Sequence, residues 1–138
     1  MRLQRGRKDM VRSVADAMTR QVVYLPEDTP LDEAAQAMRD RGIGDVVVTR
    51  GPTMAGIVTD RDIVVRAVAE HLSPATTTLG EIATRELLMV EQSATVDDAV
   101  HAMRTRGVRR LLVCDADRKV VGILSLSDIA LLPTSAAA

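Results

Sequence analysis

Two short stretches of the chain carry a hydroxyl residue followed three positions later by an aspartate. Thr59 and Asp62 form the first pair, and Ser125 and Asp128 form the second. Each pair follows a short apolar run and precedes an apolar run with helical spacing, so each should lie where a strand gives way to a helix. A hydroxyl and an acid at this spacing form a capping box, which satisfies backbone N–H groups that the first helical turn leaves without partners.

The same pairs also suit a second kind of chemistry. Exposed N–H groups at the start of a helix attract anions. Two interpretations therefore stand side by side: the four residues only punctuate helices, or they form half of a pocket for a phosphate and a sugar.

The composition limits the class of protein. The chain has 138 residues, 46% of them hydrophobic and 27% charged, which suits one compact domain or two small repeats that share a core. Tyr24 is the single aromatic residue, so a bound base would lie against Val, Ile or Met. Cys114 is the single cysteine, which excludes an internal disulfide, and its apolar neighbours predict a buried thiol. With no apolar signal core and no apolar run near about 20 residues, we expect a cytoplasmic protein that does not enter a membrane.

Hydrophobic periodicity and turn residues predict the elements that position these pairs. In order, they are a helix over 8–20, a strand over 22–25, a helix capped by Thr29 with Pro30 at its first position and ending at Gly42, strands over 45–49 and 54–59, and a helix over 60–72.

The second half of the chain repeats the first. Thr19-Arg20 matches Thr84-Arg85 at an offset of 65, and one added residue in the second hairpin turn brings Asp62 onto Asp128. Ordered matches of this kind indicate an internal duplication. A unit of about 60 residues is too small to bury much of its surface alone. The predicted fold is therefore α/β (α+β), with two repeats packed sheet against sheet in pseudo-two-fold symmetry and a cleft on either side of the shared interface.

The repeats divide the chain into five predicted segments. These are a basic arm at 1–8, the first repeat at 9–72, a linker at 73–78, the second repeat at 79–132 and a tail at 133–138.

The duplicated unit resembles a known family. A β-α-β-β-α unit that ends in Gly, two hydrophobic residues, Ser or Thr, two further residues and Asp resembles the cystathionine β-synthase (CBS) domain. The tandem resembles a CBS pair, or Bateman module, as in small stand-alone bacterial CBS-domain proteins. Residues 59–65 and 108–128 carry the resemblance, which covers roughly residues 9–132. It implies a regulatory module that binds AMP, ADP, ATP or S-adenosylmethionine between the repeats and forms a homodimer.

The resemblance also implies roles for single residues. An ionised carboxylate accepts hydrogen bonds from both ribose hydroxyls, and arginine gives charge-assisted bonds to phosphate. The second repeat would supply Asp128 for the ribose, Ser125 for the phosphate, Arg109 and Arg110 for phosphate charge, and Val108 and Ile123 as walls for the base. The first repeat would supply Asp62 and Thr59 in the same roles, with Ile43 and Ile57 as walls.

The first repeat departs from this pattern at one place. Gly44-Asp45 stands where the second repeat has Arg109-Arg110. An acid there repels phosphate unless Arg61, or a residue from across the interface, offsets it. We therefore expect only the second site to be well equipped for a nucleotide phosphate, and the first to be empty, structural, or suited to a less anionic adenosyl ligand.

Two other functions stay open. In a ligand-free interaction or stress scaffold, the hydroxyl-acid pairs would be caps only. Nucleic-acid contact would use the basic residues near the N-terminus, which are Arg2, Arg5, Arg7, Lys8 and Arg12. No basic patch continues them in the rest of the sequence, which makes this function a distant alternative.

An enzyme is the class that the sequence favours least. His71 and His101 are expected to face solvent, and neither belongs to a recognised catalytic motif or a metal site. We expect no required cofactor, and the sequence names no effector protein.

Overall fold

The computed structural model describes residues 12–130, which form two compact units. The central unit is Val22–Leu87, and the terminal unit combines Met1–Gln21 with Leu88–Ala138. The units do not follow the sequence repeats, because the segment before residue 22 joins the second repeat and residues 79–87 join the first. The basic arm and the tail lie outside the described residues. Within the part described, no helix has the length and hydropathy needed to span a bilayer.

A three-stranded mixed sheet, in the order β1-β2-β3, is the frame of the central unit. Strand β1 (Tyr24–Pro26) runs parallel to β2 (Asp45–Arg50), and β3 (Thr53–Thr59) returns antiparallel to β2. The parallel pair requires a crossover, which is helix α3 (Leu31–Arg41). That helix ends as predicted at Gly42, whose φ of 64° is the left-handed conformation that glycine adopts at low cost.

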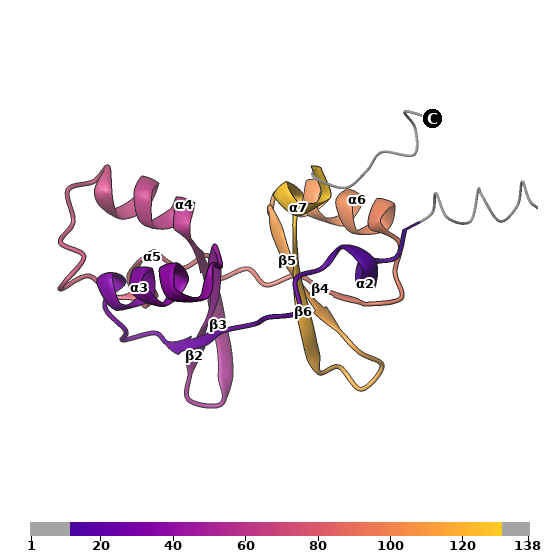
Figure 1. Ribbon diagram of the computed structural model, residues 1–138, viewed down its shortest axis with the longest axis horizontal. Coiled ribbons are helices and arrows are strands. Elements are labelled where there is room, and N and C mark those ends of the chain that lie inside the picture. Colours follow the sequence, from indigo (N-terminus) through magenta and orange to yellow (C-terminus); the bar gives the residue numbers. More distant parts are fainter. Residues whose placement is uncertain (1–11, 131–138) are drawn as a thin grey trace, which may run out of the picture. The chain divides into compact units, whose positions relative to one another are not determined.

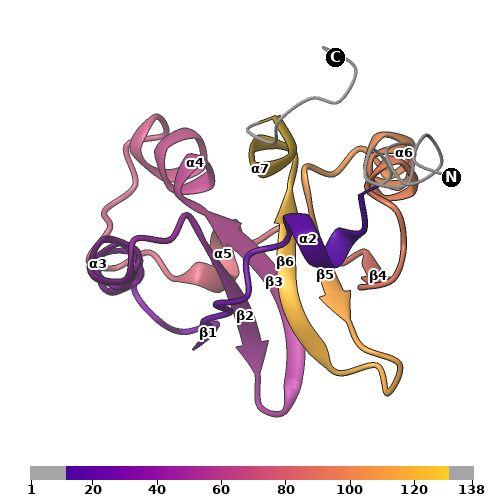
Figure 2. The same ribbon diagram turned by 45° about the vertical axis from the view of Figure 1, so that its right-hand side comes forward.

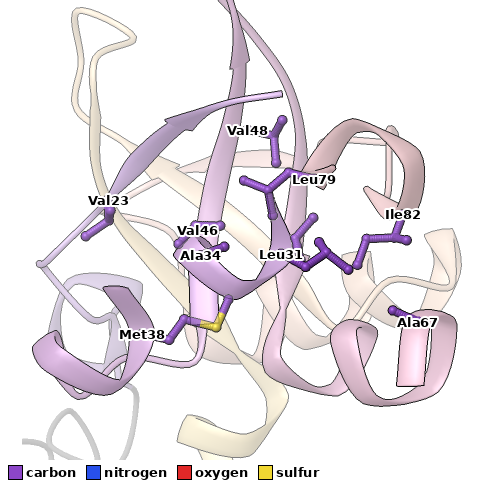
Figure 3. Close-up of a cluster of buried hydrophobic side chains, with 10 residues drawn as sticks. Val23, Leu31, Ala34, Met38, Val46, Val48, Ala67, Leu79 and Ile82 are labelled. Carbon is purple, nitrogen blue, oxygen red and sulfur yellow. The ribbon is translucent and has the colours of Figure 1, made fainter. Parts of the chain in front are cut away.

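One hydrophobic cluster holds the central unit together (Figure 3). Helix α3 contributes Leu31, Ala34 and Met38, which recur on one helical face and are buried. From the sheet, Val46 and Val48 point into the cluster, and from helix α5 (Leu79–Ile82) the two end residues do so. The burial of α5 explains why residues 79–82 belong to this unit.

The terminal unit repeats this architecture. Its sheet has the order β4-β5-β6, with β4 (Met89–Glu91) parallel and β6 (Val120–Ser125) antiparallel to β5 (Arg110–Cys114). Helix α6 (Val96–Arg106) is the crossover, and α7 (Leu126–Ala130) follows β6. Cys114 is buried and unpaired, as predicted. Helix α2 (Val14–Ala17), the indigo helix in Figures 1 and 2, completes the unit, since its buried Val14 belongs to one hydrophobic cluster with Ala99 and Met103 of α6.

Three predicted helix boundaries are wrong. Thr29 does not cap α3: its N-cap is Pro30, and the first N–H groups of α3 donate to Thr77 O (2.9 Å) and Pro74 O (3.1 Å). Backbone carbonyls of the 73–78 loop therefore accept the hydrogen bonds that a capping side chain would otherwise accept. The helix predicted over 8–20 has its described helical part only at Val14–Ala17, because Met18 turns into an extended conformation. Thr19 then pairs with β6 through two backbone hydrogen bonds.

The helix predicted over 60–72 is also different. It starts at Asp60 as α4 (Asp60–Asp62) and continues as a π-helix, η1 (Ile63–Val68). Hydrogen bonds from Ala69 N to Val64 O and from Leu72 N to Ala67 O, both 2.9 Å, show the five-residue spacing. The wide turn buries Ala67 and leaves Val64, Val65 and Val68 exposed.

Candidate functional site

The strand-to-helix junction of the central unit is a complete capping box. The Thr59 N–H donates to Asp62 Oδ2 at 2.9 Å, and the Asp62 N–H donates to Thr59 Oγ1 at 3.0 Å. Thr59 is buried and Asp62 is half-buried, so these bonds are partly shielded from water. Arg66 stands on the other side of the acid, with Nε 3.7 Å from Asp62 Oδ1. The predicted helix cap is confirmed here.

The junction of the terminal unit is built differently. The Asp128 N–H donates to Ser125 Oγ at 3.1 Å, which is the first half of a capping box. The Asp128 carboxylate accepts a hydrogen bond from the Thr19 hydroxyl, with 3.4 Å between Oγ1 and Oδ2. Ser125 is buried, whereas Asp128 is partly open to solvent. An acid and two hydroxyls therefore meet at one place, and the acid is accessible.

Two threonines that we did not predict from the sequence as site residues also lie at these junctions. Thr19 pairs with Ile123 through backbone bonds of 2.8 and 2.9 Å, and Thr84 pairs with Ile57 through two bonds of 3.0 Å. Each threonine comes from the segment that precedes the first strand of the other sequence repeat. The signal that could have found them is the match of Thr19 with Thr84 in the duplication.

Glycine makes this close approach possible. A Cβ atom on Gly56 would lie 2.7 Å from the Thr84 carbonyl oxygen. A Cβ atom on Gly122 would lie 2.6 Å from Met18 Sδ and 2.8 Å from the Thr19 carbonyl oxygen. The glycine that opens each Gly-h-h-[Ser/Thr]-x-x-Asp motif is thus required because another segment of the chain, at Thr84 or at Thr19, passes close to it.

The predicted base walls lie in two environments. Ile43 and Val108 are half-buried and pack against the hydrophobic clusters of their units. Ile57 and Ile123 are 6% and 1% exposed, and each follows a glycine on the edge strand of its sheet. Because neighbouring strand residues alternate in direction, they point away from the clusters that contain Val58 and Leu124.

Charge separates the two junctions. In the sheet register, Arg110 stands directly opposite Ser125, whereas Asp45 stands directly opposite Thr59. Arg109 precedes its strand and is exposed. The structure thus places Arg110 opposite the hydroxyl residue of the terminal unit and Asp45 opposite that of the central unit.

The histidines do not take part in either junction. His71 and His101 are both exposed, as expected. Across residues 12–130, no three His, Cys, Asp or Glu side chains are grouped in a way that would hold a metal ion.

Comparison with known proteins gives a consistent family. The CBS domain model matches residues 11–68 and 79–133. An uncharacterized protein of Methanopyrus kandleri, MK0525, is 34% identical over 119 residues, which are 85% of this chain and 60% of that protein. This chain thus spans less than two thirds of that relative. Hypoxic response protein 1 of Mycobacterium tuberculosis is also 34% identical, over 83% of this chain and 80% of its own length.

Solved structures agree with the fold. A hexameric CBS-CP12 protein from bloom-forming cyanobacteria superposes with a TM-score of 0.78 and 26% identity, over 88% of this chain and 68% of that one. The CBS domain protein PAE2072 from Pyrobaculum aerophilum, solved in complex with AMP, gives a TM-score of 0.71 and 27% identity, over 87% and 92% of the two chains. Since the family model covers both repeats and the two units share one sheet topology, the chain belongs to the CBS-domain family and carries two CBS domains in tandem.

Proposed function

We propose that the protein is a non-catalytic regulatory module whose junctions bind adenosine-containing ligands. The observation that carries this proposal is the meeting of Thr19, Ser125 and the partly open Asp128 in the terminal unit. The remaining acceptor capacity of the Asp128 carboxylate suits two ribose hydroxyls. The Ser125 hydroxyl, which accepts from the Asp128 N–H, still has its own O–H to donate to a phosphate. The AMP complex of PAE2072 supports the same ligand class.

The terminal unit is the better nucleotide site. Arg110 lies opposite Ser125 and Arg109 precedes it, so positive charge stands where the resemblance puts the phosphate. Charge-assisted bonds to phosphate are about twice as strong as neutral ones. Val108 and Ile123 would border the base. Ligand occupancy would then favour one packing of the repeats over another, and a partner protein would bind the favoured one.

Titration calorimetry tests this function. Purified protein would be titrated with AMP, ADP, ATP and S-adenosylmethionine, and so would Asp128→Ala and Asp62→Ala. Asp117→Ala is the control, because Asp117 lies in the exposed turn between β5 and β6. We expect binding that Asp128→Ala abolishes and Asp117→Ala preserves. Failure of all four compounds to bind would contradict the proposal.

A ligand-free scaffold is the second candidate, and the capping box at Thr59 and Asp62 favours it. Both partners of that box are already satisfied within the chain. In a scaffold, Asp128→Ala would lower the free energy of unfolding, and no adenosyl compound would raise the unfolding temperature of the wild-type protein.

We also propose that the module is a homodimer. Four apolar side chains on and just after η1 are exposed: Val64 at 57%, Val65 at 48%, Val68 at 58% and Leu72 at 42%. Clustered exposed apolar residues of this kind mark interaction surfaces. Sedimentation should show a dimer for the wild-type protein and a monomer for Val64→Lys/Val68→Lys. Thr105→Lys, at an exposed position of helix α6, should leave the dimer intact.

A further inference from the structure

One backbone hydrogen bond identifies matching positions in the two units. In the central unit, the Asp60 N–H donates to the Gly44 carbonyl at 2.9 Å. In the terminal unit, the Leu126 N–H donates to the Arg109 carbonyl at 3.0 Å. Both bonds join the first helical residue after the motif hydroxyl to the residue just before the middle strand. Gly44 therefore corresponds to Arg109, and Asp60 corresponds to Leu126.

At these positions the central unit replaces a cation with an anion. Gly44 has no side chain, and the Asp60 carboxylate lies over it: a Cβ atom on Gly44 would be 3.1 Å from Asp60 Oδ2 and 3.6 Å from Oδ1. The Arg61 N–H donates to Asp60 Oδ1 at 2.8 Å and helps to orient this carboxylate. Asp60 thus lies beside the point from which Arg109 leaves the backbone in the terminal unit.

The strand register adds a third pair of matching positions at which the two units differ in charge. Asp45 is opposite Thr59 where Arg110 is opposite Ser125. Three matching positions thus hold Gly44, Asp45 and Asp60 in one unit, and Arg109, Arg110 and Leu126 in the other. Two arginines return positive charge to the central unit: the exposed Arg61, matched by Ser127, and Arg66, whose Nε lies 3.7 Å from Asp62 Oδ1. Three acids stand against them, namely Asp45, Asp60 and Asp62.

We infer that the two junctions select adenosyl ligands that differ in the charge of the 5′ group, with Asp60 as the specificity-determining residue of the central unit. This inference rests on the proposed function. The terminal unit takes a ligand with an anionic 5′-phosphate. The central unit takes an adenosyl ligand whose 5′ group carries no net negative charge, such as a neutral nucleoside or a sulfonium. Asp60 is exposed, but a phosphate placed close to its carboxylate would still be repelled. A single module could therefore respond to two ligand classes.

The test isolates each junction by disabling the other. Asp128→Ala leaves the central junction, and Asp62→Ala leaves the terminal one. Each would be titrated with AMP, adenosine and S-adenosylmethionine. In Asp128→Ala, we expect adenosine and S-adenosylmethionine to bind at least about tenfold more tightly than AMP. In Asp62→Ala, the order should be reversed.

Substitutions at Asp60 then test the assigned residue. In the Asp128→Ala protein, adding Asp60→Asn should lower the ratio of the adenosine affinity to the AMP affinity by about threefold or more. Transplanting the terminal pair as Gly44→Arg/Asp60→Leu should make AMP the preferred ligand. Circular dichroism would verify the fold of both, and Asp60→Asn, the milder change, tests the inference if the transplant does not fold.

The failures can be told apart. If Asp62→Ala binds AMP but Asp128→Ala binds none of the three compounds, or binds AMP as tightly as adenosine, the inference is overturned and the proposed function stands. An unchanged ratio of affinities in Asp60→Asn also overturns it. If neither isolated junction binds any compound, the proposed function itself fails.

Discussion

The Thr19 hydroxyl donates a hydrogen bond to the Asp128 carboxylate although the two residues are 109 positions apart in the chain. The backbone of Thr19 is fixed by its two bonds to Ile123, so the hydroxyl is delivered to the acid by an ordered segment. The acid of the terminal junction is thus oriented by the other sequence repeat. Ligand binding and the attachment of residues 12–21 should therefore depend on each other.

Removing this hydroxyl should weaken nucleotide binding with little effect on folding. Thr19→Val keeps the shape of the side chain but removes the donor to Asp128. The loss of one hydrogen bond, about 1 kcal/mol, corresponds to a roughly fivefold rise in the dissociation constant for AMP. Calorimetry measures it. The matched control is Thr95→Val, which removes the N-cap of α6. It should lower the free energy of unfolding by about 1 kcal/mol and leave the affinity unchanged; the opposite pattern would contradict the role given to Thr19.

The sequence predicted the features that depend on neighbouring residues. The hydroxyl and acid of the Thr59 capping box are three positions apart, and the strand-helix change fell where the pattern put it. The glycine that ends α3 and the glycine in the tight turn after β2 were also predicted, because both positions need a residue in the left-handed backbone conformation. The family resemblance followed from the same local motif and its duplication.

Long-range pairing was not predictable in the same way. Nothing local to Thr19 or Thr84 says that each pairs with the glycine-containing strand of the other repeat. Nor does the Thr29-Pro30 pattern reveal that carbonyls of the 73–78 loop take the first N–H groups of α3. The π-helix was missed because Ile63, Val64 and Val65 fit an α-helical pattern equally well. These features depend on contacts between distant segments, which periodicity does not encode.

Gly56→Ala should destabilise the central unit. The new methyl group would lie 2.7 Å from the Thr84 carbonyl oxygen and 3.0 Å from Ala83 Cβ, so the 83–84 segment would have to move off β3. Overpacking of this kind costs about 1–3 kcal/mol, which urea unfolding would measure. Gly51→Asn is the control, because Gly51 has open space around it and a φ of 58° that asparagine tolerates. Equal stability of Gly56→Ala and Gly51→Asn would argue against the crossing of Thr84 over Gly56.

The capping box at Thr59 should contribute measurably to stability. Thr59→Ala removes the acceptor for the Asp62 N–H and should lower the free energy of unfolding by about 1 kcal/mol. Thr59→Ser keeps the oxygen and should recover most of that loss. Chemical denaturation measures both. If Thr59→Ala were as stable as Thr59→Ser, the hydroxyl would have no capping role.

The ion pair between Glu27 and Arg50 should make stability depend on acid pH. The Arg50 guanidinium donates hydrogen bonds of 2.6 and 3.1 Å to the Glu27 carboxylate, and these hold its pKa below the ordinary value against the opposing effect of burial. A carboxylate with a lowered pKa stabilises the fold at neutral pH, and this contribution is lost as the pH falls through the folded-state pKa. The difference in unfolding temperature between wild type and Glu27→Gln should therefore shrink below about pH 4.3.

The partner residue supplies the control for that pH dependence. Arg50→Met should remove most of it, and Glu27→Gln added to Arg50→Met should change little further. Moderate salt should reduce the effect, since both residues reach solvent. If the difference in unfolding temperature between wild type and Glu27→Gln persisted unchanged down to pH 3, the charge of Glu27 would not be the cause of its effect on stability.

Arg66 should couple the acid of the central junction to helix α5. Its Nη1 donates to the Ile82 carbonyl at 2.9 Å, and its Nε lies 3.7 Å from Asp62 Oδ1, so one guanidinium joins the motif acid to the end of α5. Arg66→Met keeps the aliphatic stem but leaves that carbonyl without its charged donor. We expect a loss of about 1–2 kcal/mol in the free energy of unfolding and faster hydrogen exchange at the Thr84 amide, which follows α5 and pairs with Ile57. Arg104→Met, in the last turn of α6, should change neither. If exchange at Thr84 stayed as slow in Arg66→Met as in the wild-type protein, the two elements would be held together by their buried residues alone, and Arg66 would not transmit the state of Asp62.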